Sequence, residues 1–385
     1  MRVFVVAGEP SGDRLGGALM AGLRQLVPEV TFDGVGGPLM QAQGLSSRFP
    51  MDELSVMGVA EILPKYFDLK RRIEETAQAV IETQPDVLIT IDSPDFCLRV
   101  AKIVKAQANI RTVHYVAPTV WAWRPKRADK MARVIDHVLA LFPFEPPYMQ
   151  AAGMECDFVG HPVVSEPQAT ETEITAFRTR HGLGAAPLLL VLPGSRKGEV
   201  GKLAPIFGAA LGPVLQARPD LRLVVPAAAA VAPMVREMTA AWPGTPLILD
   251  PGDTDADTAQ ADKRAAFAAA ELALAASGTV ALELAAAATP MVMAYKVNWL
   301  TWQLVRPMMR IDTANLVNLI SETRVVPECL GPDCRADLIA DTVLRVLQHP
   351  QAQQDAMALT MERLGQGGEA PGLRAARAVL RGMGA

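Results

Sequence analysis

Short apolar runs rich in β-branched residues alternate with segments of helical periodicity along most of the chain. The first pair is Val3 to Ala7, followed by Asp13 to Leu26 with leucines at helical spacing. Runs that are apolar throughout are typical of strands buried on both faces of a parallel sheet. The alternation therefore predicts a doubly wound α/β fold. We expect strands at 3–7, 31–35, 87–91, 112–116 and 137–141, and again at 188–194, 221–225, 247–249, 272–276 and 291–295.

The length of the chain favours more than one domain. It has 385 residues, which exceeds the usual size of a single hydrophobic core. The strand–helix pattern weakens between Phe158 and Pro187, where prolines flank an acidic stretch. We therefore expect two Rossmann-like domains, 1–165 and 166–350, facing across a cleft with ligands at the carboxyl ends of the strands. The remaining helical segment, 351–385, is expected to pack back on the first domain or on a partner subunit.

Composition excludes several classes of function. A net charge of −4 gives no support to nucleic-acid binding, which needs a strongly basic face. The four cysteines form no CxxC pair and there is no histidine cluster, so we expect free thiols and no metal site. The apolar tract 265–295 is interrupted by charged residues, glycine and proline, so we interpret it as core elements. The chain opens on RVFVVAG without a leader, so we expect a soluble protein or one attached to a membrane at its surface.

Three loops that follow predicted strands of the first half carry candidate site residues. AGEPSGD (7–13) and GVGG (34–37) allow tight turns whose amides can hold an anion or a sugar, although a purely structural turn fits as well. IDSPDF (91–96) offers a carboxylate that can act as a general base, or alternatively cap the next helix. The candidates are Gly8, Glu9, Ser11, Gly12 and Asp13 for the acceptor loop and Asp95 for catalysis.

Two loops of the second half have features of a diphosphate site. LPGSR (192–196) joins a strand to a helix, where the helix dipole favours phosphate and Arg196 can add a charge-assisted contact; a surface turn is the alternative. It lacks the ending of an ATP-hydrolysing P-loop. In SGTVALE (277–283), amides near Ser277, Gly278 and Thr279 can face a diphosphate. Glu283 can accept hydrogen bonds from ribose hydroxyls, or be a solvated or capping acid.

Aromatic and basic residues mark two further segments. Trp121 and Arg124 lie in HYVAPTVWAWRPKR (114–127), which suits a sugar, an acyl chain or a phosphate, although packing also explains the tryptophans. The segment 56–72 has more apolar residues than one helix face can bury, followed by a cationic run. Contact with an anionic membrane surface fits this pattern. The contact residues are Val56, Met57, Val59, Ile62, Leu63, Phe67, Lys70, Arg71 and Arg72.

Taken in order, these loops resemble one family. AGEPSGD, GVGG, MGVAE, IDSPDF, HYVAPTVWAW, FPFE, FVGHP, LPGSR with Glu199, SGT…LE, and NLI followed by VPE occur in register from residue 1 to about 350. Each motif is weak by itself, but ten in the same order are highly specific. The chain thus resembles the lipid-A-disaccharide synthases.

The resemblance implies a GT-B fold and a metal-independent, inverting glycosyl transfer without a cofactor. The implied substrates are UDP-2,3-diacylglucosamine and 2,3-diacylglucosamine 1-phosphate, which give a β-1,6-linked disaccharide and UDP at the cytoplasmic face of the inner membrane of Gram-negative bacteria. By position, Asp95 matches the family's base, Arg196 a UDP-phosphate contact and Asn318 a nucleotide-site residue. The family also implies a homodimer through the C-terminal segments. One departure is Gly331, where the family usually has Gln, so a donor contact from that position is in doubt.

Two other functions remain open from the sequence. A nucleotide-sugar 2-epimerase of the same architecture would act on the donor and need no lipid, which leaves the apolar segment 56–69 unexplained. A regulatory nucleotide-binding module would bind without catalysis, and it would be disfavoured if Asp95 faced the bound nucleotide-sugar across the cleft.

Overall fold

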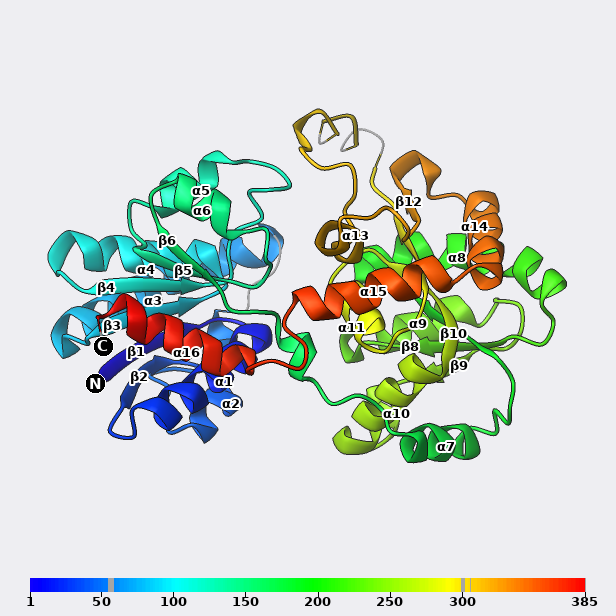
Figure 1. Ribbon diagram of the computed structural model, residues 1–385, viewed down its shortest axis with the longest axis horizontal. Helices are drawn as coiled ribbons and strands as arrows, with labels where there is room; N and C mark the ends of the chain where they lie inside the picture. Colours follow the sequence, from blue (N-terminus) through cyan, green and yellow to red (C-terminus); the bar gives the residue numbers. More distant parts are fainter. Residues whose placement is uncertain (55–58, 299–301, 305, 385) are drawn as a thin grey trace. The chain divides into compact units, whose positions relative to one another are not determined.

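A computed structural model describes residues 1–54, 59–298, 302–304 and 306–384, without the side chains of 59–66. The chain forms two compact units (Figure 1). Unit 1 comprises Met1–Ser165 together with Leu364–Ala385, and unit 2 comprises Glu166–Arg363. The predicted C-terminal segment 351–385 is therefore divided between the units, with one of its helices in each.

In its described part, unit 1 is built on a six-stranded parallel sheet of order β2-β1-β3-β4-β5-β6. The central strands are buried along their whole length, as β3 illustrates, because helices cover both faces. The predicted doubly wound pattern is confirmed here. The strands are β1 (Arg2–Ala7), β2 (Thr31–Val35), β3 (Val87–Ile91), β4 (Arg111–Tyr115), β5 (His137–Ala140) and β6 (Glu155–Phe158).

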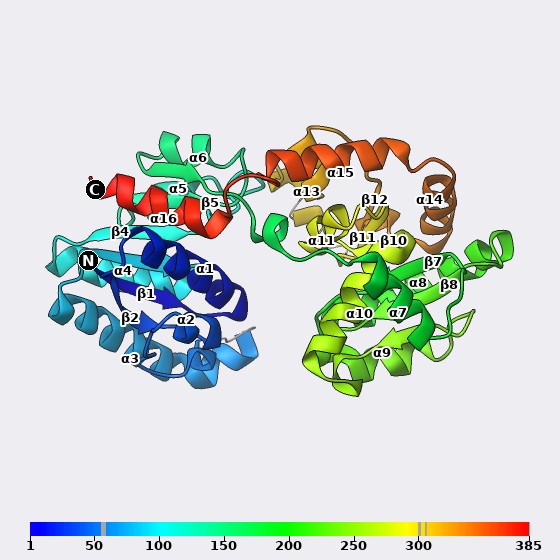
Figure 2. The same cartoon turned by 60° about the horizontal axis from the view of Figure 1, so that its bottom comes forward.

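Helices α3 and α4 pack on the face of this sheet that carries Phe4, Val6 and Leu88. Helix α1 contacts β1 and β3, and Figure 2 shows α1 and α3 on opposite sides of β1. The helices of unit 1 are α1 (Pro10–Leu26), α2 (Pro38–Ala42), α3 (Val59–Thr83), α4 (Pro94–Gln107), α5 (Lys126–Met131), α6 (Pro146–Ala151) and α16 (Pro371–Gly382), with 3-10 turns at Met51–Glu53 and Pro162–Ser165.

The C-terminal helix α16 lies directly against α1, the first helix of the chain (Figure 1). Small residues make the close approach possible: a Cβ added to Gly372 would lie 2.5 Å from the Ala18 carbonyl oxygen, and one on Gly22 would lie 2.8 Å from the Gly372 carbonyl oxygen. On α16, Ala375, Ala376 and Val379 are buried. Unit 1 is therefore completed by a segment that follows unit 2 in the sequence.

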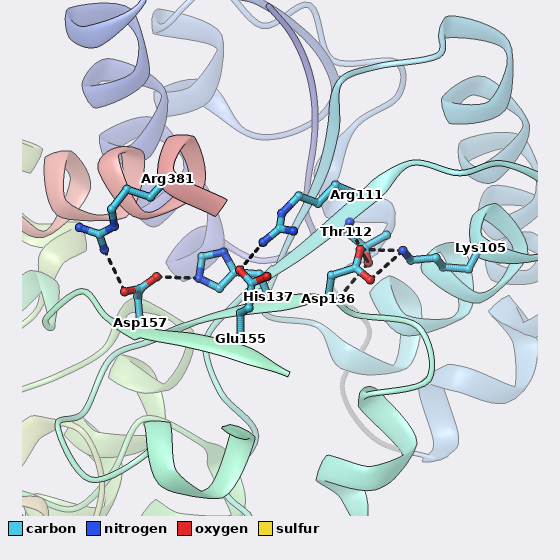
Figure 3. A network of polar contacts seen from close by, with 8 residues as sticks. All are labelled: Lys105, Arg111, Thr112, Asp136, His137, Glu155, Asp157 and Arg381. Carbon is cyan, nitrogen blue, oxygen red and sulfur yellow. Dashed lines mark hydrogen bonds and ion pairs between the residues drawn. The ribbon is translucent and has the colours of Figure 1, made fainter. Parts of the chain in front are cut away.

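A polar network ties the end of α16 to the amino-terminal edge of the sheet (Figure 3). Arg381 donates to Asp157 at 2.9 Å, and Asp157 contacts Nε2 of the buried His137 at 2.9 Å. Next to them, Arg111 pairs with Glu155. Because Arg111, His137 and Glu155 are the first residues of their strands, the network holds the end of α16 at the edge opposite the carboxyl ends of the strands.

The described part of unit 2 repeats the design, with a parallel sheet of order β12-β11-β10-β7-β8-β9. Helices α8, α9 and α14 share one core with the sheet, around Leu189, Phe207 and Val343, and α15 packs on α11 and α13. The strands are β7 (Leu188–Leu192), β8 (Arg222–Pro226), β9 (Leu247–Leu249), β10 (Ala270–Ala276), β11 (Met291–Tyr295) and β12 (Glu328–Leu330). The helices are α7 (Glu171–Arg180), α8 (Lys197–Ala217), α9 (Ala232–Thr239), α10 (Ala256–Ala269), α11 (Val280–Ala286), α13 (Leu316–Ser321), α14 (Ala336–Gln348) and α15 (Gln351–Arg363), with 3-10 turns at Ala229–Val231, Pro251–Asp253, Arg306–Met308 and Gly331–Asp333.

Helix α8 is, within the described residues, the one helix long and apolar enough to cross a membrane by length and composition. Its apolar side chains have a partner inside unit 2, because Leu203, Phe207 and Leu211 are buried in the core. The apolar tract 265–295 likewise forms core elements, since β10 and β11 are buried over most of their length.

Candidate functional site

The order of the strands reverses once in each sheet, and a loop pair with candidate motifs lies at each reversal. In unit 1, β1 lies between β2 and β3, so the loops after β1 and β3 leave the sheet side by side. In unit 2, the same holds for the loops after β7 and β10. Ligands of open α/β sheets bind at such switch points. AGEPSGD and IDSPDF thus meet in unit 1, and LPGSR and SGT meet in unit 2.

The switch point of unit 2 opens into a cavity of about 960 Å³, at the upper end of the size usual for small-molecule sites. Five of the six predicted nucleotide-site residues line it. They are Arg196, Ser277, Gly278, Thr279 and Glu283.

The LPGSR loop is held in shape by an acid one turn into α8. Glu199 accepts hydrogen bonds from the Ser195 amide at 3.2 Å and from Arg196 at 3.0 Å. Gly194 has φ +122°, and a Cβ there would lie 2.6 Å from the Glu199 Cβ, so only glycine fits. Arg196 itself is exposed at the amino terminus of a 21-residue helix. This end of the cavity offers a cation and a positive helix end to an anion.

Glu283 lies in the first turn of α11 and is bound by a residue that the sequence did not single out. Its Oε2 accepts a hydrogen bond from Lys263 Nζ at 2.5 Å, across from α10. The alternative of a purely solvated acid is therefore wrong. Lys263 lines the same cavity.

A second ion-pair group in the cavity wall was also missed. Asp262, next to Lys263 in the sequence, is only 6% exposed. It pairs with Arg180 and accepts from His181 Nε2 at 2.8 Å, and all three line the cavity. These residues come from the end of α7 and from α10, two helices that the apolar pattern did not predict. The sequence did carry one signal for the start of α7, because Thr170 and Glu173 have the spacing of a capping box, which the structure forms.

Asn318 is not among the described residues that line the cavity. It is buried in α13, where its side-chain amide donates to Thr313 Oγ1 and the Val326 carbonyl, and its Oδ1 accepts from the Val326 amide. All of these contacts lie within unit 2 and fix the turn before β12. The Asn318 side chain thus has a structural role in the described part of unit 2, and its role in the nucleotide site stays a prediction.

The backbone conformation and the neighbours of Gly331 explain why this position holds a glycine. Its φ is +55°, and a Cβ would lie 2.8 Å from the ring of Trp302. A glutamine at this position would therefore be strained and would overlap the indole. The ring of Trp302 lies where the family's amide side chain would begin.

In unit 1, Asp95 is exposed in the first turn of α4. The N-cap is Ser93, so the alternative of Asp95 as the cap is wrong. The preceding loop is strained, because Asp92 and Ser93 have φ of 52° and 42° in the left-handed region. A Cβ on Gly8 would lie 2.7 Å from Ser93 Oγ, so the loops after β1 and β3 are in direct contact.

The AGEPSGD loop is divided between exposed and structural residues. Ser11 is exposed and Glu9 is half-buried, whereas Gly8, Gly12 and Asp13 are buried. The Asp13 carboxylate accepts from the amides of Gly37, Leu39 and Met40 at 2.9–3.0 Å. It thereby caps α2 and links AGEPSGD to GVGG, so the prediction of an acceptor contact from Asp13 is replaced by a structural role.

The tryptophan loop joins an aromatic cluster at the end of β5. Trp121 is buried and meets Phe144 edge to face at 5.0 Å, so packing accounts for it. Phe144 stacks on Phe142, which stacks on His161. FPFE and FVGHP therefore contact each other through their side chains. Arg124 is exposed, with its guanidinium 4.1 Å from the ring centroid of Trp123.

The predicted membrane segment is described in part. Val56 and Met57 lie outside the described residues, as do the side chains of Val59, Ile62 and Leu63. Phe67 is 79% exposed. Lys70 and Arg71 are also exposed and pair with neighbouring acids of α3. Arg72 instead binds Glu53 at 2.8 Å and covers the Phe49 ring, so it is a structural residue.

Comparison with known proteins identifies relatives along the whole chain. The model of the lipid-A-disaccharide synthetase family matches residues 3–377. A lipid-A-disaccharide synthase of Ruegeria pomeroyi is 69% identical over 99% of this chain and 95% of its own length. A lipid-A-disaccharide synthase of Rhodospirillum centenum is 50% identical over 98% and 94%.

Among solved structures, the fold is similar to that of UDP-GlcNAc 2-epimerases. The enzyme of Neisseria meningitidis bound to UDP-GlcNAc has a TM-score of 0.63 at 10% identity, covering 100% of this chain and 99% of that one. The enzyme of Methanocaldococcus jannaschii in complex with UDP-GlcNAc and UDP has a TM-score of 0.59 at 12% identity, covering 100% of both. At such identity the likeness shows the fold alone, which is the GT-B arrangement of two Rossmann-like units.

Proposed function

The chain belongs to the lipid-A-disaccharide synthetase family, and we propose that it joins UDP-2,3-diacylglucosamine to 2,3-diacylglucosamine 1-phosphate. The products are the β-1,6-linked disaccharide 1-phosphate and UDP. The observation that carries this proposal is the cavity at the switch point of unit 2, which combines Arg196, the start of α8 and the SGT loop. This combination suits the diphosphate of a nucleotide-sugar.

In the proposed reaction, Asp95 removes the proton from the acceptor's 6-hydroxyl group. The oxygen attacks the anomeric carbon of the donor with inversion, and the bond between that carbon and the diphosphate oxygen breaks. Asp95 suits this role because it is exposed at a strand end and lies next to the loop after β1. A base within hydrogen-bond reach of the hydroxyl contributes about 10²–10⁴ in rate.

The negative charge that develops on the departing UDP is offset in unit 2. Arg196 and the amides at the start of α8 present positive charge to one place, and the amides of Gly278 and Thr279 add to it, whereas the Ser277 amide donates to the Ala294 carbonyl at 3.0 Å. Groups that are already oriented stabilise such a charge without reorganisation. Glu199 contributes indirectly, because it fixes both Ser195 and Arg196.

The proposal is tested by incubating the purified protein with both acylated sugars in EDTA and measuring the disaccharide and UDP. We expect both products in equal amounts. Asp95→Asn is expected to lower the rate by about 10²–10⁴, whereas Asp341→Asn, an exposed change on α14, leaves it unchanged. Near-normal turnover by Asp95→Asn would remove its role as base and leave the assignment of the reaction intact.

The same assay separates the two rival functions. An epimerase-like enzyme would convert or hydrolyse the donor without the acceptor and form no disaccharide. A binding module would retain UDP without turnover. The relatives named as epimerases share 10–12% of residues with this chain, whereas those named as synthases share 50–69%, which favours the transferase.

We further propose that the protein works at the cytoplasmic face of the inner membrane, with α3 as the contact. Support comes from the exposed ring of Phe67 beside the exposed cations Lys70 and Arg71. A homodimer through the C-terminal segments remains a prediction. Because α16 buries its apolar face on α1 of the same chain, such a dimer would use other surfaces or exchange this helix.

A further inference from the structure

Lys263 is a cation in the nucleotide cavity that neither the motifs nor the comparisons assign. It lies on α10, and its Nζ is 2.5 Å from Glu283 Oε2 on α11. The same ammonium group lies 5.3 Å from the ring centroid of Phe267. Both Lys263 and Glu283 line the cavity with the SGT loop.

The ion pair is only partly buried, with exposed side-chain fractions of 42% for Lys263 and 35% for Glu283. Ion pairs that are this accessible to solvent contribute little to the free energy of folding. A ligand that filled the cavity would displace water from the pair and strengthen it, because charges attract more strongly at low dielectric. The pair is therefore better placed to act on a ligand than on the stability of the unit.

The rest of α10 holds Lys263 in position. The preceding residue, Asp262, is almost buried and pairs with Arg180 and His181 at the end of α7. At the start of α10, Asp255 caps the helix through the Thr258 amide at 2.9 Å. The lysine is thus carried by a helix that is fixed at two points, and its ammonium group meets a carboxylate one turn inside α11.

We propose that Lys263 is a positioning residue that orients Glu283 toward the ribose of the bound nucleotide. This inference rests on the proposed function, in which the cavity takes UDP. With Oε2 held by Lys263, Oε1 of Glu283 is left to accept a hydrogen bond from the 2′-hydroxyl of the ribose. A carboxylate suits this contact, because charged acceptors make stronger hydrogen bonds than neutral ones.

The test compares UDP with 2′-deoxy-UDP by titration calorimetry on the full chain. We expect the wild type to bind UDP more tightly than 2′-deoxy-UDP. Lys263→Met is expected to weaken UDP binding roughly tenfold and to leave 2′-deoxy-UDP nearly unchanged, so that the preference for the ribose is lost. Lys263→Arg restores part of the preference, because it can still bind Oε2.

The matched control is Lys202→Ala, which removes an exposed cation of α8 outside the cavity lining and is expected to leave both affinities unchanged. Equal weakening of both nucleotides by Lys263→Met would overturn the proposal, since the lysine would then act on the diphosphate. Unchanged affinities, with or without a lower Tm, would overturn it as well. A wild type that binds neither nucleotide would instead refute the proposed function.

Discussion

Glu145 makes the stability of unit 1 depend on pH in a direction that can be worked out from the structure. Its carboxyl group is buried at the start of α6, and its Oε2 accepts from the amides of Leu141 and Phe142 at 3.0 and 2.9 Å. Burial raises the pKa of Glu145 from 4.5 to about 7, against these hydrogen bonds. Between these two pH values the folded protein keeps a proton that the unfolded chain releases.

Stability must therefore fall as the pH rises through this window. At about 1.4 kcal/mol for each tenfold change in proton affinity, the loss is on the order of 3 kcal/mol by pH 8. Glutamine at this position keeps one oxygen for both amides and does not ionise. Since 1 kcal/mol corresponds to about 2–4 °C in a unit of this size, Glu145→Gln should raise the Tm of unit 1 by roughly 6–12 °C at pH 8 and by much less at pH 5.

The assay is scanning calorimetry of the wild type and Glu145→Gln at four pH values between 5 and 8. Burial lowers the pKa of both His114 and His161 to about 4, so each contributes stability that is lost on acidification below about pH 6.5. Both proteins share this loss, and it cancels in the difference between them. Glu29→Gln, an exposed change, controls for the removal of a carboxylate. Curves of Tm against pH that run parallel for wild type and Glu145→Gln would refute the reasoning.

Three further results are expected. Arg196→Ala should lower kcat by about 10²–10³ with an unchanged Tm, because the side chain is exposed and, within the described residues, pairs with Glu199 alone. Steady-state kinetics in EDTA check this, and an unaltered kcat would count against the phosphate contact. Gly372→Ala should destabilise unit 1 by about 1–3 kcal/mol, because the new Cβ meets the Ala18 backbone. Its counterpart Gly212→Ala, where a Cβ meets nothing within 4 Å, should stabilise unit 2 by up to about 1 kcal/mol, and denaturant titrations compare the two. The triple change Phe67→Ser, Lys70→Gln, Arg71→Gln should reduce the fraction of protein that sediments with anionic vesicles, while binding to neutral vesicles stays as weak as that of the wild type. An unchanged fraction with anionic vesicles would place the membrane contact elsewhere.

The strands were predictable because burial on both faces leaves a continuous apolar run, as in Val87–Ile91 and Leu188–Leu192. The short strands β6 and β12 lie at sheet edges and are only partly buried, so Glu155–Phe158 and Glu328–Leu330 lack that signal. Helix α10 was missed for a related reason. Alanines and charged residues alternate in it without a strong apolar face.

The loops of the site could be placed from sequence because strand ends in a doubly wound sheet have fixed neighbours. The roles of individual side chains could not, because they depend on partners far away in the chain. Asp13 bonds to amides 24–27 residues later, and Asn318 closes a turn through Val326. Lys263 meets Glu283 only because α10 and α11 flank the same strand.

The return of α16 to α1 has a consequence for synthesis on the ribosome. The guanidinium of Arg374 binds the carbonyl of Phe158, 216 residues earlier, and Gly372 lies against Ala18. At about 5–20 residues per second, the first unit waits about 10–40 s for its last helix. During this interval the face of α1 that carries Ala18 and Gly22 lacks its cover, so the nascent chain is open to chaperones and to premature association until translation ends.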